Sequence, residues 1–165
     1  RIDKFMEKGF SYLMGVQGED GRWVPLWFGN QSALGGENPT YGTAQVVIAL
    51  TEISQGRLPH KSDLAEKGCR WLLGAQNADG GWGGAVGVPS SVEETALAVA
   101  ALAQCGHKDA VKRGVVWLIE RNESGALLDP APIGLYFAKL WYSEKLYPLI
   151  YSVIALSTAN TASSS

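Results

Sequence analysis

The stretch KGCRWLLGAQNADGGW, Lys67–Trp82, repeats a pattern that already occurs at Lys8–Trp23 as KGFSYLMGVQGEDGRW. The two copies align without a gap, and a decayed third copy, RGVVWLIERNESG from Arg113, lacks the Gln and the final Trp. The residues that we assign to this structural repeat are Gln17, Asp20, Trp23, Gln76, Asp79 and Trp82. A helical pattern ending in Ala-Leu follows each copy, so the repeating unit is predicted to be a helical hairpin.

The glycine-rich end of the second copy, QNADGGWGG from Gln76, could by composition be a linker, a phosphate-binding loop, a sugar-binding loop or a structural clamp. No GxxxxGK[ST] sequence follows a strand, which argues against a phosphate loop. Gln76 lies in the last turn of a predicted helix, where its amide can tie the helix end to the returning loop. The glycines permit a positive φ, and Trp82 can fold back over the helix end. We therefore interpret this stretch as a clamp without a catalytic role.

Composition and periodicity predict an all-α fold of α/α-hairpin repeats in one domain. Of the 165 residues, 46% are hydrophobic and 18% charged, which is enough apolar material for a core. One hairpin cannot bury both of its faces, so neighbouring hairpins must stack. We expect a repeat domain over residues 1–159, with closing helices at Ile133–Tyr142 and Glu144–Thr158, and a disordered tail over residues 160–165.

Charge and cysteine usage exclude several classes of function. The net charge is −2 and no basic stripe occurs, so nucleic acid is not expected as a partner. The apolar runs are shorter than the roughly 20 residues of a spanning helix, and no signal-peptide pattern is present. Cys69 and Cys105 are expected to be free thiols. His60 and His107 have no second ligand at metal spacing, so we expect no metal and no cofactor.

The two full copies share the pattern [KR]Gxx[FYW]L…Q…GxW. This pattern resembles the QW repeat of squalene–hopene cyclase and the other triterpene cyclases, which is also called the prenyltransferase and squalene oxidase repeat. Further agreement comes from Tyr41-Gly42-Thr43, from the segment Ser91–Ala96 and from Tyr147-Pro148. The resemblance covers almost the whole chain and matches the C-terminal part of such cyclases. It implies about three of the six hairpins that close the family's α/α toroid.

The resemblance implies a cation–olefin polycyclisation of a linear triterpene in terpenoid or hopanoid biosynthesis. Aromatic faces stabilise the carbocations of such a reaction without trapping them. The substrate-cavity candidates in this chain are Trp27, Phe28 and Tyr142. Two further positions that are aromatic in the family correspond to Ala131 and Lys139, and a lysine ammonium facing a carbocation would repel it.

The chain departs from the family because it contains no Asp-x-Asp-Asp, the motif that protonates the substrate. The nearest sequence, Glu93-Glu94, is expected to be a solvated first turn of a helix, favoured by the helix dipole. We therefore expect no catalytic residue in this chain and an acid motif upstream of Arg1. On this view the chain is a fragment of an intramolecular transferase, an isomerase of the squalene cyclase type, and is inactive alone.

Three functions follow from these observations. The first is the C-terminal part of a squalene–hopene-cyclase-like enzyme, with an apolar isoprenoid substrate, a cytoplasmic location and peripheral contact with the cytoplasmic face of a membrane. The alternative is a non-catalytic α/α repeat module that binds a lipid or a protein partner. A third candidate is a protein prenyltransferase β-subunit, whose zinc would have to use Cys105 and His107. Uncovered helix faces of a partial ring also predict self-association.

Overall fold

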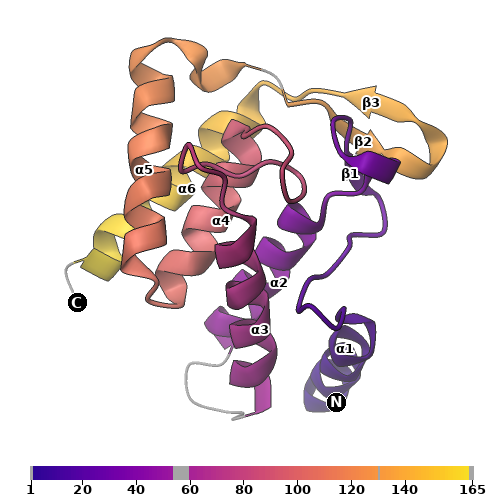
Figure 1. Cartoon of the computed structure of the whole chain (residues 1–165). Coiled ribbons are helices and arrows are strands. Elements are labelled where there is room, and N and C mark those ends of the chain that lie inside the picture. The colour runs from indigo at the N-terminus through magenta and orange to yellow at the C-terminus, as the bar shows by residue number, and fades with distance from the viewer. Residues whose placement is uncertain (1, 54–59, 130, 164–165) are drawn as a thin grey trace.

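The computed structural model describes residues 2–53, 60–129 and 131–163. Within these described residues, six α-helices, three short strands and three 3-10 turns follow one another (Figure 1). The helices are α1 (Ile2–Val16), α2 (Pro39–Ile53), α3 (His60–Ala75), α4 (Val92–Gln104), α5 (Lys108–Glu123) and α6 (Leu146–Ser163). The strands are β1 (Phe28–Asn30), β2 (Ile133–Leu135) and β3 (Leu140–Tyr142), and the 3-10 turns are η1 (Leu34–Gly36), η2 (Ala126–Leu128) and η3 (Tyr136–Ala138). The predicted all-α class is confirmed, with a small sheet added.

Helix α4 forms the centre of the molecule. It packs against α2, α5 and α6, while α3 packs against α2 on the outside (Figure 1). Every residue of α4 from Val92 to Ala103 is buried. The run is rich in alanine, which favours the helix and leaves little side-chain bulk, so the neighbouring helices can approach closely. This arrangement brings the beginnings of α2, α4 and α6 close to one another.

The segment from Ile133 to Tyr142, predicted to be helical, instead forms β2, η3 and β3, and this prediction was wrong. β1 pairs antiparallel with β2 through Phe28 and Leu135, and β2 pairs antiparallel with β3 through Gly134 and Trp141. A Cβ at Gly134 would collide with the backbone of Leu140, so glycine permits the close pairing. Lys139 adopts a left-handed conformation with φ 51°, which ends η3 and turns the chain into β3.

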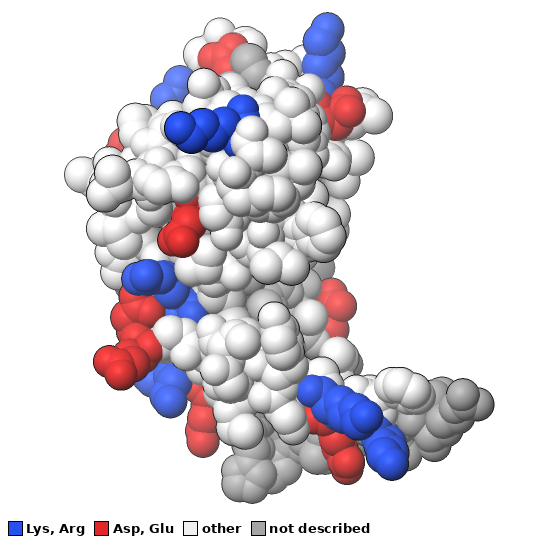
Figure 2. All heavy atoms as spheres, turned by 90° about the vertical axis from the view of Figure 1, so that its right-hand side faces the viewer, with Lys and Arg blue, Asp and Glu red and all other residues white. Residues whose placement is uncertain are grey.

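The last helix and the first helix both leave apolar side chains in solvent. Helix α6 continues to Ser163, four residues into the segment for which a disordered tail is predicted, and residues 164–165 lie outside the described residues. Its Val153 is 64% exposed. Helix α1 lies at the edge of the molecule (Figure 1), where Phe5 and Tyr12 are each 65% exposed. Figure 2 shows mixed positive and negative side chains scattered over one face of the molecule, without a basic patch.

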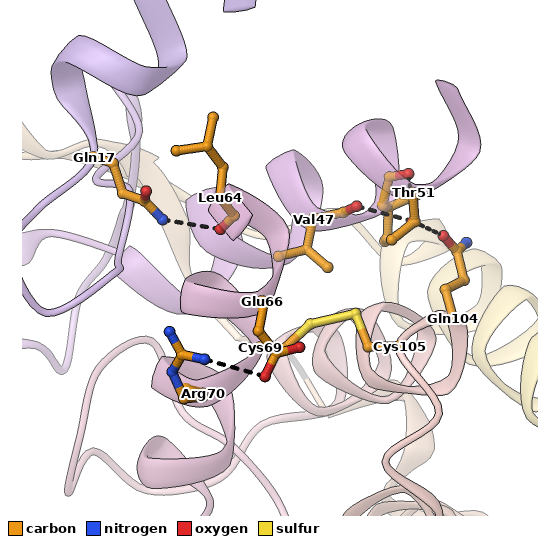
Figure 3. Close-up of a disulfide and its surroundings, with 10 residues drawn as sticks. Gln17, Val47, Thr51, Leu64, Glu66, Cys69, Arg70, Gln104 and Cys105 are labelled. Carbon is orange, nitrogen blue, oxygen red and sulfur yellow. Dashed lines mark hydrogen bonds and ion pairs between the residues drawn. A yellow bond between two sulfur atoms is a disulfide. The ribbon is translucent and has the colours of Figure 1, made fainter. Parts of the chain in front are cut away.

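Cys69 and Cys105 form a disulfide, which corrects the expectation of two free thiols. The bond joins α3 to the residue that follows α4, across 36 residues of sequence (Figure 3). Such a separation gives no local cysteine motif, because the two residues meet only after α3 and α4 have packed. Beside the disulfide, the Thr51 hydroxyl of α2 contacts the Gln104 side chain of α4 (Figure 3).

Candidate functional site

The two full repeat copies form the same clamp twice. The Gln17 amide donates to the carbonyl of Gly21 at 2.9 Å, and the Gln76 amide donates to the carbonyl of Gly80 at 2.9 Å. These glycines have φ values of 96° and 91°, which favour glycine and turn the loop back on the helix end. Each glutamine therefore ties the end of its helix to the loop that follows.

The tryptophan of each copy closes the clamp. The Trp23 indole N–H donates to the carbonyl of Leu13 at 2.8 Å, and its backbone N–H donates to the Thr43 hydroxyl at 2.9 Å. The Trp82 ring is fully buried, and its indole N–H donates to the carbonyl of Leu72 at 2.7 Å. Its backbone N–H bonds to the Thr95 hydroxyl at 2.9 Å. The Thr that both second helices share is therefore part of the clamp.

The glutamines also reach beyond their own hairpins. Gln17 donates to the backbone carbonyl of Leu64 at 3.1 Å, and Gln76 donates to that of Ala110 at 3.0 Å (Figure 3 shows the first pair). Leu64 lies near the start of α3 and Ala110 near the start of α5, the first helices of the following repeats. Each clamp thus fastens one repeat to the next.

The aspartates of the two copies have different surroundings. Asp20 pairs with Arg22 at the surface, at 2.7 Å. Asp79 accepts from the N–H of Gly81 at 3.0 Å, from the Ser90 hydroxyl at 2.8 Å and from the indole of Trp117 at 3.0 Å. Partial burial alone would raise the pKa of Asp79, but these hydrogen bonds outweigh it and lower the pKa. Asp79 is therefore held as an anion that links the second clamp to α5.

The three sequence-predicted cavity candidates come together in one pocket at the sheet. Trp27, Phe28 and Tyr142 line a hollow of about 280 Å³ together with Gly134 and Leu135. Trp27 is 57% exposed and Tyr142 45% exposed, so the hollow opens to the surface of the described chain. Strand pairing explains the meeting, because β2 lies between β1 and β3. We call this hollow the aromatic pocket.

A pair of tyrosines adjoins the aromatic pocket. The ring of Tyr41 stacks on that of Phe28 with centroids 4.7 Å apart. The Tyr41 and Tyr151 side chains interact electrostatically, which couples α2 to α6. Burial raises the pKa of Tyr41 despite this interaction. Burial also raises the pKa of Tyr151, and the neighbouring Tyr41 raises it further, so both phenols are neutral near pH 7.

Glu93 and Glu94 are buried, which corrects the expectation of a solvated helix start. Glu93 is 4% exposed and Glu94 is 1% exposed. Glu94 accepts from the amide of Asn38 at 2.7 Å, from that of Asn30 at 3.1 Å and from the Ser91 hydroxyl. Asn30 ends β1 and Asn38 directly precedes α2, both far from Glu94 in sequence, so no local pattern could reveal that the segment before α2 covers the start of α4.

Glu93 has fewer partners than Glu94. The backbone N–H groups of Glu93 itself and of Ala131 lower the pKa of its carboxyl, but by less than burial raises it. Its Oε2 atom is buried and accepts no hydrogen bond among the described residues. Burial raises the pKa of Glu93 to about 7, and the nearby Glu94 adds to the rise. The adjacent apolar run ALAVAAL is a sequence signal that this part of the helix is buried.

The two positions that are aromatic in the family lie away from the lining of the aromatic pocket. Ala131 is buried beside Glu93, and Lys139 is exposed at the turn before β3. Neither residue is among those that line the aromatic pocket.

The described residues offer no site for a metal. Residues 2–53, 60–129 and 131–163 contain no group of three or more His, Cys, Asp or Glu side chains placed to hold a metal ion. Cys105, which a prenyltransferase-like zinc site would need, is bonded to Cys69. Among the helices that the structure describes, none combines the length and apolar character needed to cross a bilayer.

Comparison with known proteins places these features in a family. Residues 1–161 match the family model described as squalene-hopene cyclase C-terminal domain. The chain is 31% identical to a squalene–hopene cyclase of Bradyrhizobium diazoefficiens, over 90% of this chain and 24% of that protein. It is 28% identical to an ent-copalyl diphosphate synthase of a Streptomyces species, over 89% of this chain and 25% of that protein. The chain thus spans about a quarter of the length of these relatives.

A solved structure of a protein from Actinoplanes resembles the fold with a TM-score of 0.55 and 21% identity. The match covers 68% of this chain and 32% of that one. At this identity the likeness concerns the fold alone.

Proposed function

The chain belongs to the squalene-hopene cyclase C-terminal domain family, and we propose that it forms one wall of a terpene-cyclising cavity in a larger enzyme. In this proposal Trp27, Phe28 and Tyr142 face an apolar isoprenoid substrate, and the reaction is a cation–olefin polycyclisation. The clamps of the repeat hold the wall in shape and take no part in the chemistry.

The observation that carries the proposal is the convergence of the three aromatic side chains on the aromatic pocket. Trp27 and Phe28 come from the loop after the first repeat, and Tyr142 comes from β3, more than one hundred residues later. Aromatic rings offer a carbocation the negative face of a quadrupole, worth about 0.5–2 kcal/mol per ring. The aromatic lining of the pocket supports the proposal, because it offers such faces to a cation.

The proposal assigns the initiating acid to a part of the enzyme outside these residues. The sequence holds no Asp-x-Asp-Asp, and Glu93 and Glu94 are covered by protein rather than lining the aromatic pocket. We therefore infer that the domain alone does not start a cyclisation.

The test uses the full-length protein that carries this domain, incubated with squalene and analysed by gas chromatography and mass spectrometry. Replacing Trp27 or Tyr142 by Ala is expected to reduce the fully cyclised product about 2- to 30-fold, or to divert it to partly cyclised products. Phe137→Ala is the matched control, since Phe137 is 64% exposed in the same β2–β3 hairpin and does not line the aromatic pocket. Equal products from all three variants would refute the wall assignment.

A non-catalytic repeat module remains the competing proposal, favoured by the missing acid motif and the exposed apolar faces of α1 and α6. Such a module could bind a lipid or associate with itself or another protein through these faces. A full-length protein that forms no cyclised product from squalene or shorter isoprenoids, yet binds them, would support this alternative.

A further inference from the structure

Two adjacent carboxyl groups at the start of α4 have opposite environments. Glu94 is satisfied by Asn30, Asn38 and Ser91, so it serves to fix the long loop to the helix. Glu93 is equally buried, yet its Oε2 atom accepts no hydrogen bond among the described residues. Burying a carboxyl group without satisfying it is costly, and such groups are concentrated at functional sites.

A series of electrostatic and aromatic interactions leads from Glu93 to the aromatic pocket. Glu93 and Tyr151 interact electrostatically across the α4–α6 packing. Tyr151 interacts in turn with Tyr41, whose ring stacks on Phe28 in the pocket wall. Tyr41 also interacts with Tyr142, which lines the same pocket. Tyr151 and Tyr41 therefore couple the carboxyl group to the pocket wall.

We propose that Glu93 supplies the negative charge that balances a hydrophobic cation held at the aromatic pocket, acting through the hydroxyls of Tyr151 and Tyr41. This inference rests on the proposed function, because the cation would be the carbocation formed during cyclisation. Glu93 does not line the pocket, so its effect is electrostatic, and a protein interior screens such effects less than water does.

The ionisable groups that surround Glu93 make this role dependent on pH. Glu94 adds negative charge from the same helix, and Tyr151 and Tyr41 add neutral phenols from α6 and α2. Beside Ala131, a polar hollow contains Arg121 and Asp129, which carry opposite charges. Because burial raises the pKa of Glu93 to about 7, this carboxyl is partly protonated at neutral pH. A cation in the aromatic pocket would favour its ionised form and release its proton.

The test measures that proton. The full-length protein is titrated at pH 7 with decyltrimethylammonium, a stable cation with an apolar tail, by calorimetry in phosphate and in Tris. The difference in heat between the two buffers gives the protons released per cation bound. The expected release is up to about half a proton for the natural protein and none for Glu93→Gln. Glu123→Gln, an exposed change on α5, is the matched control and should leave the release unchanged.

Three further measurements fix the interpretation. Tyr142→Ala should weaken binding of the ammonium probe, because Tyr142 lines the aromatic pocket. If binding is unchanged, the probe lies elsewhere and the inference fails. Infrared difference spectra of the natural protein should show the carbonyl band of a protonated carboxyl fading when the probe is added. This readout serves if Glu93→Gln does not fold. Decanol, which is neutral, should bind with no proton release.

The outcomes separate this inference from the proposed function. Binding of decanol and of the ammonium probe at the aromatic pocket, with equal proton release by the natural protein and Glu93→Gln, overturns the role of Glu93 and leaves the apolar wall intact. Failure of both probes to bind overturns the inference and counts against the proposed function as well. Binding of decanol alone overturns the inference only.

Discussion

Replacing Trp82 by Ala tests whether the clamp stabilises the fold. The indole ring is fully buried in the core, and its N–H donates to the carbonyl of Leu72. Gly114 of α5 approaches the ring so closely that a Cβ there would lie 2.8 Å from it. The core around this ring is therefore tightly packed and cannot easily collapse into the space that alanine leaves.

The expected cost is about 3–5 kcal/mol in the free energy of unfolding, the range for large aromatic residues removed from a core. Trp82→Phe retains most of the ring but loses the N–H, and should cost about 1 kcal/mol from the lost hydrogen bond plus a smaller packing loss. The assay is urea unfolding of the purified protein, followed by circular dichroism at 222 nm, a helix signal.

Two comparisons make this prediction specific. Asn122→Ala changes an exposed residue at the position that corresponds to Gln76 in the decayed third copy, and should change stability by about 0.5 kcal/mol or less. Trp23→Ala should cost less than Trp82→Ala, because the helix that Trp23 clamps, α1, leaves Phe5 and Tyr12 in solvent. If Trp82→Ala and Asn122→Ala have the same midpoint, the clamp interpretation is wrong.

Three other predictions follow from the described contacts. The pKa of Glu93 is higher in the folded protein than in the unfolded chain, so between these two pKa values the folded protein holds a proton that the unfolded chain has lost. The contribution of Glu93 to stability should therefore fall as pH rises from about 4.5 to about 7 and then level off. Thermal melts at pH 5 and pH 8 should show this loss in the natural protein and not in Glu93→Gln. Reduction of the Cys69–Cys105 disulfide should lower stability by about 3–4 kcal/mol, the value for a closed loop of this length; titration of thiols in denaturant should find none before reduction and two after it, and two before reduction would disprove the bond. Asn38→Ala should cost about 1–3 kcal/mol, because it removes a donor from the buried Glu94 carboxylate; unchanged urea midpoints would show that Glu94 is satisfied without it.

The repeat was the part of the fold that the sequence could predict. Residues within one copy, such as Gln76 and Trp82, bond to atoms of the same helix end and loop, so spacing alone indicates the clamp. The cavity candidates Trp27 and Tyr142 were named from the resemblance to the cyclase family, and their meeting at one pocket depends on strand pairing that no local pattern encodes.

The errors share a physical cause, which is that each depends on contacts distant in sequence. Glu93 and Glu94 have the pattern of a dipole-favoured helix start, and only the covering loop with Asn30 and Asn38 buries Glu94. The apolar residues near Ile133 fit a helix as well as a strand until they pair with β1, more than one hundred residues earlier in the chain. Helical periodicity describes one element at a time, and these features arise between elements.

The clamps bear on how repeat proteins of this kind can gain or lose hairpins during evolution. Gln17 and Gln76 each donate a hydrogen bond to a backbone carbonyl of the following repeat, and every residue has such a carbonyl. The bond to the carbonyl therefore needs no matching side chain on the receiving helix, although the Arg113 side chain of α5 also contacts the Gln76 side-chain oxygen. A duplicated hairpin inserted between two others would meet a ready carbonyl acceptor. Such a joint lets evolution add or remove whole hairpins by gene duplication and recombination, while each new unit is free to change the residues that face a substrate.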